Sequence, residues 1–245
     1  METFDPETFG LLNAHDYDER NDPGTTEAEV ALIQEIAGSG DVLELAIGTG
    51  RVAVPLAQAG VNISGIEASQ PMVDKLREKP AGRDIPVVIG DIAEVSIDGM
   101  FDHIFLVFNT LFNLQTQREQ IRCFENVSKR LREKGTFLVS AFVPDFNAFQ
   151  SHQRVGIRQM QQDSVWLDAC QHDPVDQILE FQRIHLKEDG LRLVPLRLRY
   201  VWPSEMDLMT QLAGLRLKSR WGGWDRSEFD AASKMHVSVF EKAHA

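Results

Sequence analysis

A glycine-rich turn and two later acidic residues form the pattern in this sequence that could bind a cofactor. Residues 44–50 read ELAIGTG and lie between an apolar run and a stretch with helical spacing. Glycines at such a turn let the backbone come close to a ligand. Glu67 ends the next apolar run, and Asp91 follows the one after it. The carboxyl ends of parallel strands meet at one sheet edge, so this spacing predicts a ligand crevice there.

The turn alone fits two classes of cofactor site. Dinucleotide-binding domains also place such a turn after their first strand, and their GxGxxG pattern is matched here by Gly48, Gly50 and Ala53. The two acids after the second and third strands, Glu67 and Asp91, favour a site for a cofactor other than a dinucleotide. An NAD-dependent oxidoreductase and a non-enzymatic cofactor-binding module remain the alternatives.

The whole series resembles the class I S-adenosylmethionine-dependent methyltransferases, whose first motif has the form ExGxGxG; Ala46 stands here for its first glycine. The resemblance implies S-adenosyl-L-methionine as cofactor. It assigns the ribose hydroxyls to Glu67, the adenine amino group to Asp91 and the adenine ring to the backbone N–H of Ile92. A buried carboxylate suits a diol because it accepts two hydrogen bonds. The expected cofactor-binding residues are Tyr17, Glu44, Ala46, Gly48, Gly50, Arg51, Glu67, Ala68, Asp91, Ile92 and Asn109.

The acceptor is expected to be a small molecule, more often an amine than a hydroxyl. The loop after the fourth strand, residues 108–114, lacks the Asn-Pro-Pro-Tyr signature of enzymes that methylate planar amino groups. An amine needs only to be unprotonated, whereas a hydroxyl needs a base, for which Tyr17, His15 and His236 are the candidates. The expected walls of the acceptor pocket are Phe112, Trp166, Arg199, Tyr200, Trp202 and Trp221.

Alternating strand and helix patterns indicate which elements position these groups. Strands are predicted at 42–45, 61–67, 85–90, 101–108, 136–141, 215–221 and 236–240, and helices near 26–38, 70–78, 116–132 and 203–212. This order predicts an α/β fold of the Rossmann-like, doubly wound type, with a mostly parallel seven-stranded sheet. Residues 1–142 and 203–245 would form the cofactor-binding core. Residues 143–202 are predicted to form an antiparallel β insertion, most similar in layout to amino-sugar N-methyltransferases, that covers the acceptor or contacts a second subunit.

Composition narrows the possible partners. The net charge of −12 opposes binding to nucleic acid, because that affinity depends on contacts from lysine and arginine to phosphates. Cys123 and Cys170 occur in unlike contexts, which predicts reduced thiols and no metal site. No apolar run is long enough to cross a bilayer, and the N-terminus has no basic or apolar leader. We therefore expect a cytoplasmic protein, without a membrane or nucleic-acid partner, that could form a homodimer.

Overall fold

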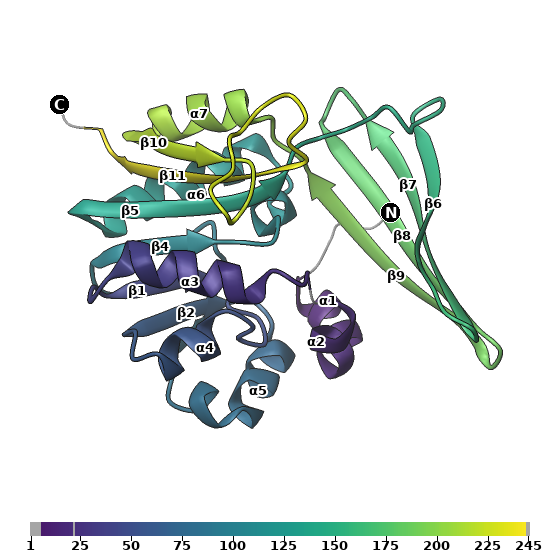
Figure 1. Cartoon of the computed structure of the whole chain (residues 1–245), viewed down its shortest axis with the longest axis horizontal. Coiled ribbons are helices and arrows are strands. Elements are labelled where there is room, and N and C mark those ends of the chain that lie inside the picture. The colour runs from purple at the N-terminus through teal and green to yellow at the C-terminus, as the bar shows by residue number, and fades with distance from the viewer. Residues whose placement is uncertain (1–5, 22, 244–245) are drawn as a thin grey trace.

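Two β-sheets form the frame of the protein in the computed structural model, which describes residues 6–21 and 23–243 (Figure 1). The larger sheet has seven strands in the order β10-β11-β5-β4-β1-β2-β3. Strands β1 to β5 pair in parallel, and β11 runs antiparallel to both of its neighbours. The strands are β1 (Val42–Leu45), β2 (Ile63–Glu67), β3 (Val87–Ile89), β4 (Phe101–Leu106), β5 (Leu131–Phe142), β10 (Leu215–Trp221) and β11 (Met235–Lys242).

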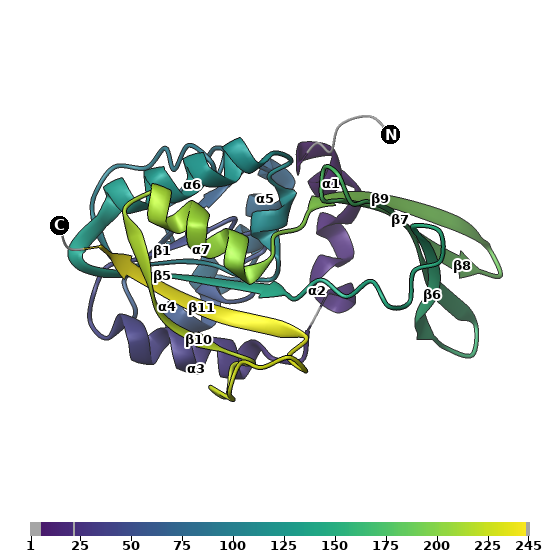
Figure 2. The ribbon, with the colours of Figure 1, turned by 90° about the horizontal axis from the view of Figure 1, so that it is seen from above.

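Helices cover both faces of this sheet (Figure 2). One buried cluster joins α3 (Thr26–Ala37), α4 (Ala53–Gln58) and α5 (Gln70–Glu78) to one face. A second cluster joins α6 (Gln117–Arg130) and α7 (Pro203–Leu212) to the other face. A sheet covered on both sides buries its strands along their length, and all four residues of β1 are buried.

Local sequence signals explain where these helices begin. The Thr116 hydroxyl accepts the Glu119 N–H and the Glu119 carboxylate accepts the Thr116 N–H, which together make a capping box at the start of α6. Helix α3 begins at Thr26, as predicted, and Thr25 is its N-cap. The Thr25 hydroxyl donates to the Glu29 carboxylate at 2.6 Å instead of accepting a backbone N–H.

The N-terminal segment forms a separate arm. It contains α1 (Pro6–Asn13), a 3₁₀ turn (Ala14–Asp16) and the short α2 (Tyr17–Arg20). Both views place α1 and α2 between the core and the second sheet (Figures 1 and 2). A Cβ on Gly10 would lie 1.7 Å from the Ser69 hydroxyl, so α1 packs directly against the start of α5.

The second sheet contains four antiparallel strands in the order β6-β7-β8-β9. They are β6 (Gln153–Met160), β7 (Ser164–Asp173), β8 (Ile178–Lys187) and β9 (Gly190–Arg199). At its base, Cys170, Leu179 and Leu198 join the main hydrophobic cluster. The sheet stands beyond the carboxyl ends of the parallel strands (Figure 1).

The predicted fold class is confirmed: an α/β core with a mostly parallel seven-stranded sheet carries an antiparallel sheet between β5 and α7. Within the described residues, no helix is both long and apolar enough to cross a membrane.

Candidate active site

Gly48 and Gly50, in the turn after β1, have different structural roles. Ala46, Gly48 and Gly50 all adopt left-handed backbone conformations, with φ of 54°, 57° and 78°. A Cβ on Gly48 would meet nothing closer than 3.9 Å, so the backbone here lies open to a ligand. A Cβ on Gly50 would come within 2.3 Å of Leu76, so this glycine allows α5 to pack closely.

Glu67 ends β2 beside this turn and is 7% exposed. Its carboxylate accepts the backbone N–H groups of Gly48 and Ser69, each at 2.9 Å. Burial raises the pKa of Glu67, and these backbone donors partly oppose the shift. The carboxylate is therefore fixed in direction, and each of its oxygens retains a lone pair for another donor.

A cavity opens next to Glu67, and we call it the cofactor cavity. Parts of the N-terminal arm, the glycine-rich turn, the ends of β2 and β3 and the loop after β4 surround it. Its lining residues are Tyr17, Ala46, Gly48, Glu67, Ala68, Ser69, Met72, Asp91, Ile92, Thr110, Asn113 and Leu114. Seven of the residues expected to bind cofactor thus line one space.

The donor set of this cavity fits S-adenosylmethionine. The Ser69 hydroxyl is buried in its wall and has no hydrogen-bond partner among the described residues. Beside it, Glu67 would accept the ribose hydroxyls, and Gly48 leaves room for the backbone to approach the ligand. One Asp91 oxygen accepts the Ala93 N–H at 2.8 Å, which leaves the other free for the adenine amino group. Met72 and Ile92 supply apolar walls of the kind that a purine ring requires.

Tyr17 closes the cavity from the N-terminal arm. Burial raises the pKa of its phenol, and the charges of Arg51 and Arg183 oppose the shift in part. The next residue, Asp18, anchors the arm: it pairs with Lys79 at 2.6 Å and accepts a hydrogen bond from the Thr49 hydroxyl. His15 does not lie in the cavity; its side chain is 62% exposed and pairs with Asp16 at 2.9 Å.

The loop after β4 supplies cavity residues that sequence reasoning missed: Thr110, Asn113 and Leu114. Phe108 and Asn109 have positive φ of 61° and 66°, a costly conformation for these residues that turns the chain sharply into a 3₁₀ helix. Asn109 itself lies outside the lining. Its side-chain oxygen accepts the Phe142 N–H at 2.7 Å and so ties this loop to the end of β5.

Phe112 packs inside the protein instead of lining the cavity. It is fully buried, and its ring meets that of Phe142 edge to face with centroids 4.9 Å apart. Phe112 therefore packs the loop after β4 against the end of β5. This position differs from the expected one in the wall of an acceptor pocket.

Glu44 and Arg51 lie behind the turn, outside the lining of the cofactor cavity. Glu44 is 3% exposed, one of its oxygens has no partner among the described residues, and burial raises its pKa well above the usual value. Arg51 pairs with the buried Glu29 at 2.8 Å and lies over the Phe108 ring. Gly50 and Arg51 line a neighbouring hollow with Asp18 and Lys79.

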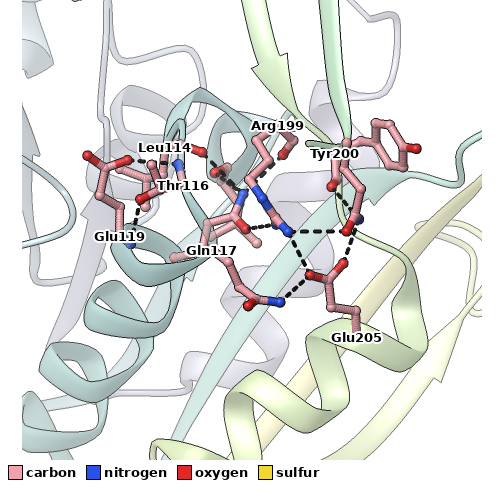
Figure 3. Close-up of polar contacts among 10 residues, drawn as sticks. Leu114, Thr116, Gln117, Glu119, Arg199, Tyr200 and Glu205 are labelled. Atoms are coloured by element: carbon pink, nitrogen blue, oxygen red, sulfur yellow. Dashed lines mark hydrogen bonds and ion pairs between the residues drawn. The ribbon is translucent and has the colours of Figure 1, made fainter. Parts of the chain in front are cut away.

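Arg199 connects the insertion to the core (Figure 3). Its guanidinium donates to Gln120 at 2.6 Å, to Gln177 at 3.2 Å and to Glu205 at 2.8 Å. Gln117 donates to the same Glu205 oxygen at 2.7 Å. These contacts tie β9 to α6 and α7, a supporting role that differs from the expected one in acceptor binding.

The aromatic residues expected to form the acceptor pocket are spread over the insertion and the last hairpin. Tyr200 is buried, and its hydroxyl lies 3.0 Å from Nε2 of His172. Trp202 is 40% exposed beside Tyr200, and Trp221 packs on the cluster at the α3 face under Arg226. Trp166 stacks on His185 on the insertion sheet.

His236 lies in the sheet, away from the cofactor cavity. It is fully buried, its Nδ1 lies 2.8 Å from the Ser238 hydroxyl, and burial lowers its pKa to about 3. Arg220, which pairs with Asp207 of α7, donates to the same hydroxyl. His236 is therefore a neutral packing residue beneath α7. In the part of the chain that the structure describes, no three histidine, cysteine or acidic side chains gather as a metal site.

Comparisons with known proteins agree with this geometry. The family described as a methyltransferase domain matches residues 42–135. The solved structure of the CcbJ methyltransferase from Streptomyces caelestis is similar over 98% of this chain and 100% of its own, with 39% identity and a TM-score of 0.93. The cypemycin N-terminal methyltransferase of a Streptomyces species is 26% identical over 204 residues, which are 82% of each protein.

A more distant structure shows the same fold with the cofactor in place. The S-adenosylmethionine-bound CalS10, an amino pentose methyltransferase from Micromonospora echinaspora, has a TM-score of 0.69 and 16% identity, over 92% of this chain and 94% of its own.

Proposed function

Because this chain belongs to the S-adenosylmethionine-dependent methyltransferases, we propose that it transfers a methyl group to an amine nitrogen of a small molecule. Family membership leaves no support for the oxidoreductase and non-enzymatic alternatives. The observation that carries the choice of an amine is the set of titratable groups on the wall of the cofactor cavity. Among the described residues these are Tyr17, Glu67 and Asp91.

None of the three is placed as a free base for a hydroxyl. Burial raises the pKa of Tyr17, so at neutral pH its phenol is protonated. Glu67 and Asp91 keep lone pairs beside their backbone contacts, but these lone pairs would accept the ribose hydroxyls and the adenine amino group of the bound donor. A hydroxyl acceptor needs a group that removes its proton during attack, whereas an unprotonated amine attacks directly and loses its extra proton afterwards to water. The cavity therefore suits an amine.

The chain's own residues bind, orient and enclose the reactants. Glu67, Ser69 and the Gly48 backbone would hold the ribose, and Asp91 with Ile92 would hold the adenine. Bound S-adenosylmethionine supplies the reactive methyl carbon on a positively charged sulfur, which is a good leaving group. Tyr17 and the anchored arm would exclude water from the reacting atoms, and much of the rate would come from this alignment.

Two of the compared proteins support an amine acceptor by their descriptions, one acting at an N-terminus and the other on an amino pentose. The sheet β6–β9 stands beyond the carboxyl ends of the parallel strands (Figure 1). We therefore propose that residues 143–202 cover the acceptor, which would restrict access to small molecules.

The test uses a radiolabelled methyl donor with cell metabolites, nucleic acid and protein supplied separately. We expect label in the metabolite fraction. Acetylation of the metabolites with acetic anhydride in water, which blocks amines before hydroxyls, should abolish the labelling. Uptake that survives acetylation would contradict an amine acceptor, and label confined to the macromolecules would contradict a small one. Glu67→Gln, which should bind the methyl donor more weakly, serves as the control for labelling that depends on the cofactor site.

A further inference from the structure

The inner face of the insertion sheet carries a charged cluster that is paired only loosely. Asp168 of β7 lies opposite Arg183 of β8. Arg183 Nε is 3.7 Å and Arg158 Nη1 is 3.6 Å from the Asp168 carboxylate. These separations allow an ion pair but exceed hydrogen-bond length. By contrast, Arg192 in the same sheet pairs with Asp16 at 3.0 Å.

Several polar atoms in this cluster are buried without a hydrogen-bond partner in the described residues. They include Asp168 Oδ1, Arg183 Nε and, on the N-terminal arm, Arg20 Nη1. A buried donor that is left unpaired destabilises the folded state, and more so when it is charged. Such a cost is retained in a folded protein when a ligand removes it during function.

These groups surround a hollow between the insertion and the N-terminal arm, which we call the arginine hollow. Arg20, Arg158 and Arg183 line it together with Asn13, Asn21, Gln159, Trp166 and Val194. The N-terminal arm, which forms the other wall of the hollow, also carries Tyr17, and Tyr17 lines the cofactor cavity. The positive charge of Arg183 lowers the pKa of the Tyr17 phenol, against the effect of burial. The hollow and the cofactor cavity therefore both border α2, the hollow at Arg20 and the cavity at Tyr17.

The charge balance of the hollow is positive in a chain of net charge −12. Arg20 and Arg192 share Asp16, while Arg158 and Arg183 share Asp168. Guanidinium groups that crowd one another in a partly buried space favour an anion, and their planar donors match a carboxylate or phosphate bidentately. The Trp166 ring, under Arg20, adds an apolar wall.

We propose that the arginine hollow binds an anionic group of the methyl acceptor, a carboxylate or a phosphate, and thereby directs the acceptor's amine past Tyr17 toward the cofactor cavity. This inference rests on the proposed function for the identity of the reacting group. The anion site itself rests only on the cluster described above.

Anion binding can be measured without the acceptor. Inorganic phosphate and acetate are titrated calorimetrically into the full chain saturated with S-adenosylhomocysteine, at constant ionic strength. We expect at least one anion to bind, and Arg183→Met and Arg158→Met each to weaken it about tenfold or more, the worth of one charge-assisted contact. Arg216→Met removes an exposed guanidinium on β10 that pairs with Glu241, and should leave anion binding unchanged.

A second variant predicts an effect of opposite sign. Asp168→Asn removes the carboxylate that competes for both arginines, so anion binding should become severalfold tighter, which a misfolded protein could not show. Phosphate binding alone would indicate a phosphorylated acceptor, and acetate binding alone a carboxylate-bearing one. The proposal is overturned if neither anion binds the wild type, or if Arg183→Met, Arg158→Met and Asp168→Asn all bind as the wild type does. S-adenosylhomocysteine affinity should stay constant throughout, and failure of methyl transfer to amines would be seen only in the labelling experiment.

Discussion

Replacing Glu67 with glutamine should weaken cofactor binding without unfolding the protein. The carboxylate is 7% exposed and is directed by the N–H groups of Gly48 and Ser69. Glutamine keeps the shape of the side chain but removes its charge, and its NH2 group can no longer accept one of the two backbone N–H groups. Because burial raises the pKa of Glu67, the charge costs the folded state free energy at neutral pH, and its removal should not lower stability by itself.

The expected magnitude follows from the two ribose hydrogen bonds. A hydrogen bond to a charged group contributes about 1.5 to 3 kcal/mol, and a neutral one about 0.5 to 1.5 kcal/mol. Losing the charge at two bonds should therefore cost about 2 to 3 kcal/mol, which is roughly a 30- to 150-fold rise in the Kd for S-adenosylhomocysteine.

Calorimetric titration of S-adenosylhomocysteine measures this effect, and thermal unfolding checks the fold, with a Tm change of no more than about 4 °C expected. Glu78→Gln is the matched control, since Glu78 lies exposed on α5 and pairs with Lys75. Wild-type affinity should also fall as pH falls through the raised pKa of Glu67, while the variant's affinity stays flat. Equal affinities for wild type and Glu67→Gln would refute the placement of the ribose.

Three further substitutions test other parts of the site. Arg199→Met should lower the free energy of unfolding by about 1 to 3 kcal/mol in urea titrations, because Glu205 loses a buried partner; a change in acceptor KM with normal stability would contradict this structural role. Glu44→Gln should raise the Tm more at pH 8 than at pH 5, since a raised folded-state pKa means that stability is lost as pH rises through it; a gain confined to low pH would refute the sign. Gly10→Val should displace α1 from Ser69 and weaken S-adenosylhomocysteine binding in the same calorimetric assay; unchanged affinity would mean that the arm's docking does not matter.

The sequence predicted the core of the site because its signals are local. Glu67 and Asp91 each follow a parallel strand, so chain order alone brings them to one sheet edge with the glycine-rich turn. The same reasoning missed Thr110 and Asn113. Their position depends on two consecutive left-handed residues, Phe108 and Asn109. Asn often adopts this conformation, but Phe rarely does, so the residue types do not predict two such residues in succession.

Contacts between distant segments account for the other differences. Arg199 alternates along β9 as a solvated or substrate-facing residue would, yet its partners Gln120 and Glu205 come from two helices of the core (Figure 3). His236 does lie near the carboxyl edge of the sheet, opposite Ala141 of β5, but strand alternation turns it toward α7. The alternation of residues along a strand predicts on which face of the sheet a side chain lies. The residues that it contacts there are known only from the packed structure.

The most direct test of methyl transfer to an amine is to identify the methylated atom. The enzyme is supplied with a ¹³C-methyl donor and the metabolite fraction that takes up label, and the purified product is analysed by NMR while S-adenosylhomocysteine is quantified. The account predicts one ¹³C-methyl bonded to nitrogen for each S-adenosylhomocysteine formed. A methyl on oxygen or carbon, or S-adenosylhomocysteine release without a methylated product, would contradict it.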